Sequence, residues 1–146
     1  MPNILINGIP KSGTHALVKT VQLLGQSNTD HQHMPFDVNV KSKHIHIIRN
    51  PRNVLLSYVR FTKAQVTTGF IIGAMSDFLG QSIRQVFEDY QPWLLDPSTL
   101  TVKFENLISD SGDTVNLIAD YLNVPFLDDV YENIEGLTTT WTVDYS

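Results

Sequence analysis

The sequence predicts an α/β fold with three layers, in which a mainly parallel sheet lies between helices. Short β-rich apolar segments alternate along the chain with longer segments whose apolar residues recur at helical spacing. The segment at residues 44–48 alternates and then becomes fully apolar, which is typical of a central strand in a covered parallel sheet. Strands separated by helices imply right-handed crossovers and a sheet of at least three strands. With 146 residues, 42% of them hydrophobic, the chain is expected to form one domain over residues 1–146.

The first part of this pattern is a strand, a glycine-bounded turn and a helix. Ile4-Leu5-Ile6 predicts the strand, and apolar residues at helical spacing from Leu17 to Leu24 predict the helix. Gly25 is expected just after the helix, where a residue of positive φ commonly ends it. Residues 26–43 are polar and rich in turn-forming residues, so we expect a loop there.

A second strand and helix follow. The strand over residues 44–48 is expected to end at Arg49. Asn50 and Pro51 are expected to begin a helix that runs to about Lys63, because Asn caps helix N-termini and Pro suits the first helical position. Residues 64–74 give no clear assignment. The remaining expected elements are a helix over 75–90, a strand over 99–104, helices over 114–122 and 126–134, and a last strand or ordered tail over 136–146.

The net charge of −5 is unevenly distributed along the chain. Residues 1–84 hold nine of the ten basic residues and three acidic ones, a net charge of +6, whereas residues 85–146 have a net charge of −11. All five histidines lie before residue 47. An anionic ligand is therefore expected at the N-terminal half. The basic residues are not interleaved with aromatic ones, so nucleic acid is not an expected partner.

Composition also bears on membranes, location and metals. No apolar run approaches the ~20 residues that span a bilayer, so no membrane partner is expected. The N-terminus lacks a signal-peptide pattern, and we expect a cytoplasmic protein. The chain has no cysteine, which excludes disulfides and thiolate zinc sites, and its histidines lack clear carboxylate partners for a metal.

The turn from Gly8 to Leu17 has the features of a phosphate-binding loop. A strand, a glycine turn and a helix direct backbone N–H groups and a helix N-terminus at one point. Gly8 and Gly13 permit positive φ and close approach of the backbone, and Lys11 adds a mobile cation. The usual nucleotide loop has its lysine directly after the second glycine, where this chain has Thr14. A conventional ATPase or GTPase is therefore disfavoured.

Two motifs resemble those of sulfotransferases that use PAPS (3′-phosphoadenosine 5′-phosphosulfate). Pro10-Lys11-Ser12-Gly13-Thr14 is similar to the family's 5′-phosphosulfate loop. The segment from Arg49 to Ser57, with an arginine at a strand end and a serine eight residues later, resembles its 3′-phosphate motif. The similarity is good over residues 4–25 and 44–62 and looser over 93–125.

This resemblance implies a reduced, P-loop-like sulfotransferase fold and transfer of a sulfuryl group from PAPS to a hydroxyl or amine acceptor, which leaves PAP. It implies that Lys11 stabilises the departing oxygen, since such transfers depend on positioning and charge neutralisation. The acceptor would be a small molecule or carbohydrate, no metal is required, and a homo-oligomer is left open. The implied cofactor-binding residues are Pro10, Lys11, Ser12, Gly13, Thr14, His15, Arg49 and Ser57.

The acceptor also needs a base, and histidine titrates nearest to neutral pH. The family's cytosolic branch has its catalytic histidine in a His-Leu-Pro segment, which His33-Met34-Pro35 resembles, so His33 is the candidate. His31 is an alternative. The Golgi branch uses a glutamate instead, which leaves Asp30 and Asp37 open.

The sequence departs from the family pattern at the adenine site. The cytosolic branch reads Thr-Thr-Trp where this chain has Thr14-His15-Ala16, so the tryptophan that stacks on adenine is missing. Trp93, Phe104 and Trp141 are the aromatic residues considered as replacements. The family's later Arg-Lys-Gly segment has no counterpart. A P-loop nucleotide or small-molecule kinase and a truncated, non-catalytic nucleotide-binding module therefore remain as alternatives.

Overall fold

The computed structural model describes residues 4–40 and 42–125. These residues form four strands and seven helical segments. In chain order they are β1 (Ile4–Asn7), α1 (Thr14–Leu23), β2 (Thr29–Gln32), β3 (Lys43–Ile48), α2 (Pro51–Lys63), α3 (Thr68–Ser76), α4 (Ile83–Tyr90), the 3₁₀-helix η1 (Gln91–Leu95), β4 (Thr99–Lys103), α5 (Phe104–Ser109) and α6 (Ser111–Leu122).

The four strands form one sheet in the order β2-β1-β3-β4, and each neighbouring pair is parallel. The carboxyl ends of all four strands therefore lie at the same edge, as is usual where parallel sheets bind ligands. Strand β2 lies in the segment that was expected to be a loop. Its sequence Thr29-Asp30-His31-Gln32 is polar because it is an edge strand with one pairing partner, so it carries no apolar run that predicts a strand.

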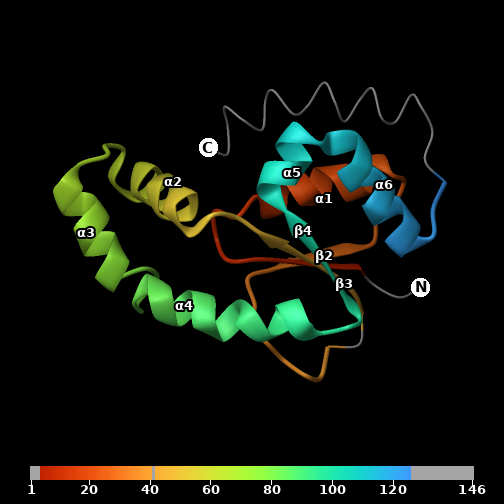
Figure 1. The fold of residues 1–146 in the computed structure, drawn as a ribbon, viewed down its shortest axis with the longest axis horizontal. Helices are drawn as coiled ribbons and strands as arrows, with labels where there is room; N and C mark the ends of the chain where they lie inside the picture. Colours follow the sequence, from red (N-terminus) through yellow and green to blue (C-terminus); the bar gives the residue numbers. More distant parts are fainter. Residues whose placement is uncertain (1–3, 41, 126–146) are drawn as a thin grey trace.

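Helices cover both faces of this sheet, which confirms the predicted three-layer α/β architecture. In Figure 1, α1, α5 and α6 lie on one side of the strands and α4 lies on the other. The first face holds the larger core, whose fully buried members come from both strands and helices. They include Ile6, Leu17, Val21, Ile45, Ile47, Leu107, Val115 and Ile118.

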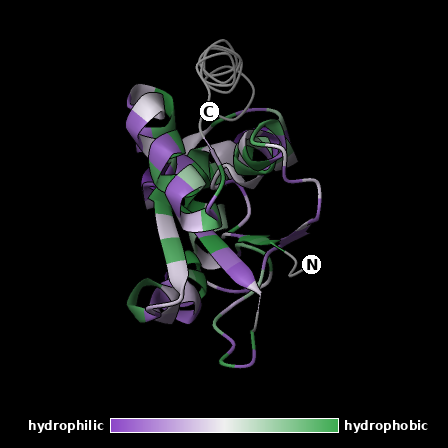
Figure 2. Ribbon diagram, turned by 90° about the vertical axis from the view of Figure 1, so that its right-hand side faces the viewer, coloured by the Kyte–Doolittle hydropathy of each residue, from purple (hydrophilic) through white to green (hydrophobic). Residues whose placement is uncertain are grey.

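The second face packs the sheet against α2, α4 and η1 through a smaller core. Its buried members are Ile9, Val54, Phe78, Val86, Tyr90 and Trp93. His44 and His46 of β3 point to this side, where His44 contacts the Trp93 ring and His46 stacks on Tyr90. Both histidines are 2% exposed and belong to the packing between the sheet and these helices. Hydrophobic and hydrophilic segments alternate along the outer helices (Figure 2), as expected for helices with one face in a core.

The predicted end of α1 and both predicted ends of α2 are confirmed. Gly25 has a φ of 87° and its N–H donates to the Gln22 carbonyl at 2.9 Å, which ends α1. The Asn50 side chain accepts a hydrogen bond from the N–H of Arg52 at 3.0 Å, and Pro51 is the first residue of α2. Helix α2 ends at Lys63, as expected.

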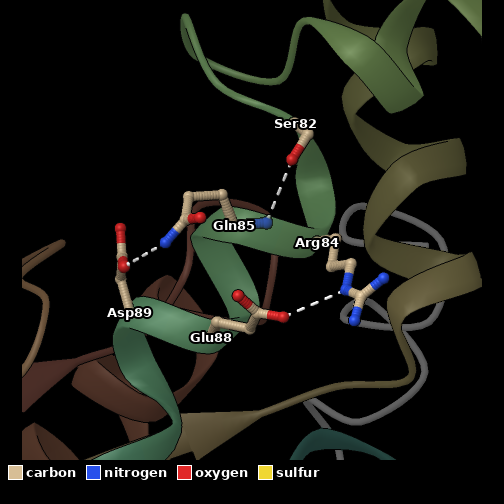
Figure 3. Close-up of polar contacts among 5 residues, drawn as sticks. All are labelled: Ser82, Arg84, Gln85, Glu88 and Asp89. Atoms are coloured by element: carbon tan, nitrogen blue, oxygen red, sulfur yellow. Dashed lines mark hydrogen bonds and ion pairs between the residues drawn. The ribbon is translucent and has the colours of Figure 1, made fainter.

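The single helix expected over residues 75–90 is wrong, because a turn divides this region into α3 and α4. Phe78 and Gln81 exchange backbone hydrogen bonds across the turn, and Leu79 and Gly80 have φ values of 56° and 86°. Phe78 is fully buried, so its apolar character reflects the core beneath the turn rather than a helical stripe. Helix α4 begins at Ile83 and is capped by the preceding Ser82, whose side chain accepts a hydrogen bond from the N–H of Gln85 (Figure 3).

The strand expected over residues 99–104 is β4, which ends at Lys103. Helix α5 follows it directly and was not predicted from the sequence. The elements expected over residues 126–134 and 136–146 lie outside the described residues. Within residues 4–40 and 42–125, none of the helices is both long enough and apolar enough to cross a bilayer.

Candidate active site

The loop between β1 and α1 has a backbone shape that only glycine accommodates at two positions. Gly13 has a φ of 98°, and a Cβ atom there would overlap the ring of Phe104. A Cβ atom on Gly8 would lie 2.8 Å from the Ile47 carbonyl oxygen. Between them, Lys11 has a φ of 72°, a left-handed conformation that is uncommon for a residue with a side chain. The loop therefore packs tightly on β3 and α5 and leads directly into the N-terminus of α1.

A cavity of about 460 Å³ opens beside this loop, within the range of ~300–1,000 Å³ that small-molecule sites occupy. We call it the loop cavity. It is lined by Pro10, Lys11, Gly13, Thr14, His15, His33, Ser57 and Phe61. The structure thus brings together all of the predicted site residues except Ser12 and Arg49. The ionisable side chains among these lining residues are Lys11, His15 and His33, and none of them is a carboxylate.

The imidazole of His33 has a defined orientation in the loop cavity. Its Nδ1 lies 2.8 Å from the Gly8 carbonyl oxygen. A carbonyl oxygen can only accept, so Nδ1 carries the proton and donates it in this hydrogen bond. In the neutral ring this leaves a lone pair on Nε2, which is the form that a general base requires.

The segment that carries His33 is fixed by two buried side chains, Asn7 and Trp93, neither of which was predicted to have this role. Asn7, at the end of β1, has no exposed surface; its amide donates to the Met34 carbonyl at 2.8 Å and its oxygen accepts from the Met34 N–H at 2.7 Å. The indole Nε1 of Trp93 donates to the same carbonyl at 3.0 Å. The only sequence signal for Asn7 is a polar residue at the end of an apolar strand.

The other candidate bases, His31, Asp30 and Asp37, do not line the loop cavity. His31 lies between His33 and His15, with ring centroids 5.0 Å and 4.8 Å away. Burial lowers the pKa of His31, the charges of His15 and His33 lower it further, and Asp30 opposes the shift. The Asp30 carboxylate accepts hydrogen bonds from the Gln32 side chain. Asp37 accepts one from the Asn39 N–H at 2.9 Å.

Burial and three neighbouring basic residues lower the pKa of His15. Burial lowers the pKa of His15 most, followed by the charges of His33, Lys11 and Lys19. Burial also lowers the pKa of Lys11. The Lys11 ammonium lies 3.6 Å from the centroid of the Phe61 ring, close enough for a cation–π contact. The neighbouring positive charges therefore disfavour protonation of His15, and an anion placed beside them would relieve that repulsion.

Arg49 and Ser57 are not brought to the same cavity. Ser57 lines the loop cavity from α2, whereas Arg49 and Ser12 line a second cavity of about 480 Å³ beside α4. The Arg49 Nη1 donates to the Lys11 carbonyl at 3.0 Å, and its guanidinium carbon lies 4.5 Å above the Phe104 ring. Desolvation by burial lowers the pKa of Arg49, with Glu105 opposing the shift. Arg49 thus stabilises the loop backbone at Lys11 and does not line the loop cavity.

Two of the three aromatic residues considered for adenine stacking, Trp93 and Phe104, are buried. Trp93 is 1% exposed and its indole nitrogen is bonded to Met34. Phe104 is 5% exposed and is enclosed by Arg49 and Gly13. Trp141 lies outside the described residues. In the part of the chain that the structure describes, no cluster of three or more His, Asp or Glu side chains could hold a metal ion.

Two solved structures share this fold. The crystal structure of mouse sulfotransferase SULT7A1 complexed with PAP matches with a TM-score of 0.78 and 18% sequence identity, over 94% of this chain and 63% of that one. Retinol dehydratase in complex with androsterone and inactive cofactor PAP matches with a TM-score of 0.77 and 12% identity, over 93% and 64%. The chain therefore spans less than two thirds of the length of either protein. Comparison with curated proteins gave no significant match.

The family model of the sulfotransferase domain matches residues 29–144, which is most of the chain. The match includes the segments that carry His33, Arg49 and Ser57, and it begins after the glycine loop. The structural matches extend over 94% and 93% of the chain and show the same fold. The protein belongs to the sulfotransferase domain family.

Proposed function

We propose that this protein transfers a sulfuryl group from PAPS to the hydroxyl or amine group of a small-molecule or carbohydrate acceptor and releases PAP. The observation that carries the proposal is the loop cavity, which Lys11 and His33 both line next to a glycine loop and a helix N-terminus. Family membership and the two PAP-bound structures of the same fold support the choice of cofactor.

The residues of the cavity fit the 5′-phosphosulfate end of PAPS. The first turn of α1 has backbone N–H groups without intrahelical partners, and the helix dipole favours an anion there. Gly13 lets the backbone approach closely, and Thr14 also lines the cavity. Ser57 faces the same cavity from α2 and would hold a phosphate oxygen. The Ser12 N–H, in contrast, donates to the Ile9 carbonyl at 3.1 Å and is already used within the loop.

The reaction requires one proton transfer and one sulfuryl transfer. His33 Nε2 would accept the proton of the acceptor hydroxyl while that oxygen attacks sulfur, so that the new S–O bond forms. The bond from sulfur to the bridging oxygen of the 5′-phosphate breaks, and both electrons stay on that oxygen. Lys11 would donate a hydrogen bond to it and neutralise its growing charge. Gly8, which orients His33 through its carbonyl, keeps the lone pair directed away from the loop.

Ligand binding separates this function from that of a kinase. PAP should raise the melting temperature without Mg²⁺, whereas ATP with Mg²⁺ should leave it nearly unchanged, because the loop lacks a lysine after its second glycine. Transfer of labelled sulfate from PAPS to a panel of hydroxyl and amine acceptors then tests turnover. Stabilisation by PAP without transfer to any acceptor would favour a non-catalytic binding module.

Matched variants test the roles of the two groups. Lys11→Ala and His33→Ala should each reduce transfer by roughly 10²–10⁴-fold, the usual effect of losing a charge stabiliser or a general base. Asp30→Asn is the control, since its carboxylate does not line the loop cavity. Full activity of His33→Ala together with loss of activity in Asp30→Asn would assign the base to the carboxylate.

A further inference from the structure

Phe61 has a position that packing does not explain. It lies on α2 with 73% of its surface exposed and belongs to none of the hydrophobic cores among the described residues. It follows Ser57 by one helical turn, so the two side chains share a face of α2, and both line the loop cavity. Its ring lies beneath the Lys11 ammonium, 3.6 Å from centroid to Nζ.

We propose that Phe61 is a positioning residue that holds the Lys11 ammonium over the loop cavity through a cation–π contact. The inference rests on the proposed function, in which Lys11 acts on the departing oxygen. A lysine side chain carries ~2 kcal/mol of rotamer entropy, so an unsupported ammonium samples many positions. The ring occupies one side of the ammonium and leaves its remaining N–H groups to the ligand.

The two ends of Lys11 are then held by different elements. Its carbonyl accepts a hydrogen bond from Arg49 at 3.0 Å, which fixes the backbone at a φ of 72°. Its ammonium is held by α2 through Phe61. Desolvation beside the ring also accords with the lowered pKa of Lys11. Because Phe61 also borders the space an acceptor would occupy, a test must separate an electronic contribution from a steric one.

Fluorination of the ring provides that separation. Replacing Phe61 with mono-, di- and trifluorophenylalanine keeps its size and weakens the negative potential of its face. The turnover number for transfer from PAPS should fall stepwise along the series, to a total of roughly two- to fivefold, as expected for a cation–π contact at an exposed site. The KM for the acceptor should change less than the turnover number. A turnover number that does not follow the fluorination series would overturn the proposal.

A second phenylalanine supplies the matched control. Phe70 of α3 lies 5.8 Å from the Lys63 Nζ and does not line the loop cavity. The same fluorinated residues at position 70 should leave transfer unchanged. An equal decline at both positions would indicate a general effect of fluorination and would also refute the role of Phe61.

An activity-independent measurement distinguishes failure of this inference from failure of the proposed function. In the ligand-free protein, the ring current of Phe61 should move the Lys11 Hε resonances upfield, and Phe61→Leu should abolish that shift. Absence of the shift in the wild type would sink the inference even if transfer is normal. A shift that is present in a protein that never transfers sulfate would contradict the proposed function and leave the contact established.

Discussion

Acidification should destabilise the fold through two buried histidines on β3. Burial lowers the pKa values of both His44 and His46 from 6.5 to about 4, and His44 adds a repulsive contribution at His46. The unfolded chain takes up protons at these residues below pH 6.5, whereas the folded protein resists protonation until about pH 4. The unfolded state therefore binds more protons throughout this window, so the free energy of unfolding must fall as the pH falls.

The magnitude follows from the linkage relation. Between pH 7 and pH 5 each histidine removes about 2 kcal/mol from the free energy of unfolding, because each pKa unit corresponds to about 1.4 kcal/mol. The two together remove about 4 kcal/mol, a large share of the ~5–15 kcal/mol of a typical domain. Asp96 does not contribute in this window, since its hydrogen bond from Thr99 lowers its pKa below 3.8.

The substitution His46→Leu removes the contribution of one of the two histidines to this pH dependence of stability. Neither ring nitrogen of His46 has a hydrogen-bond partner among the described residues, so an apolar replacement leaves no group unpaired. His44 is less suitable, because its Nδ1 bonds to the Thr99 hydroxyl at 2.8 Å. Urea unfolding followed by circular dichroism at pH 7 and pH 5 should show about half the wild-type loss in the variant. The reasoning fails if the wild type loses under 1 kcal/mol, or if the variant keeps the full pH dependence.

Three further substitutions test the loop, the His33 segment and a helix cap. Gly13→Ala should cost at least about 1–2 kcal/mol in urea unfolding, because its φ of 98° is left-handed and its Cβ would overlap Phe104; unchanged stability would mean that the loop relaxes freely. Asn7→Ala should cost about 1–3 kcal/mol and lower turnover more than it raises the KM for PAPS, since Met34 loses two hydrogen bonds; an effect on KM alone would contradict this positioning. Asn50→Ala should lower the free energy of unfolding by about 1 kcal/mol through loss of the α2 cap, and a neutral result would show that water replaces it.

The parts of the fold that the sequence predicted are those with strong local signals. Glycine permits positive φ and proline fixes φ near its helical value, so Gly25 located the end of α1 and Asn50-Pro51 located the start of α2. Strand β3 was predicted because burial on both faces requires apolar residues. Strand β2 was missed because its stability comes from pairing with β1, which no local pattern records.

The same distinction applies to the candidate site. Lys11, Thr14 and His33 were predicted from motifs, and the structure brings them to one cavity. The positions of Asn7 and Phe61 depend on contacts with Met34 and Lys11 from distant parts of the chain, so spacing along the sequence gave no sign of them. Burial of Trp93 was likewise invisible, because an aromatic residue suits either a core or a base-stacking surface.

The hydrogen bond from Arg49 to the Lys11 carbonyl makes the two nucleotide motifs thermodynamically dependent on each other. A phosphate that drew the guanidinium away would release the loop, and a loop tightened around a phosphosulfate would in turn alter Arg49. Such a coupling free energy is reciprocal, whichever motif is occupied first. Under the proposed function the nucleotide would be recognised as one unit, and removal of either phosphate should weaken binding of the other.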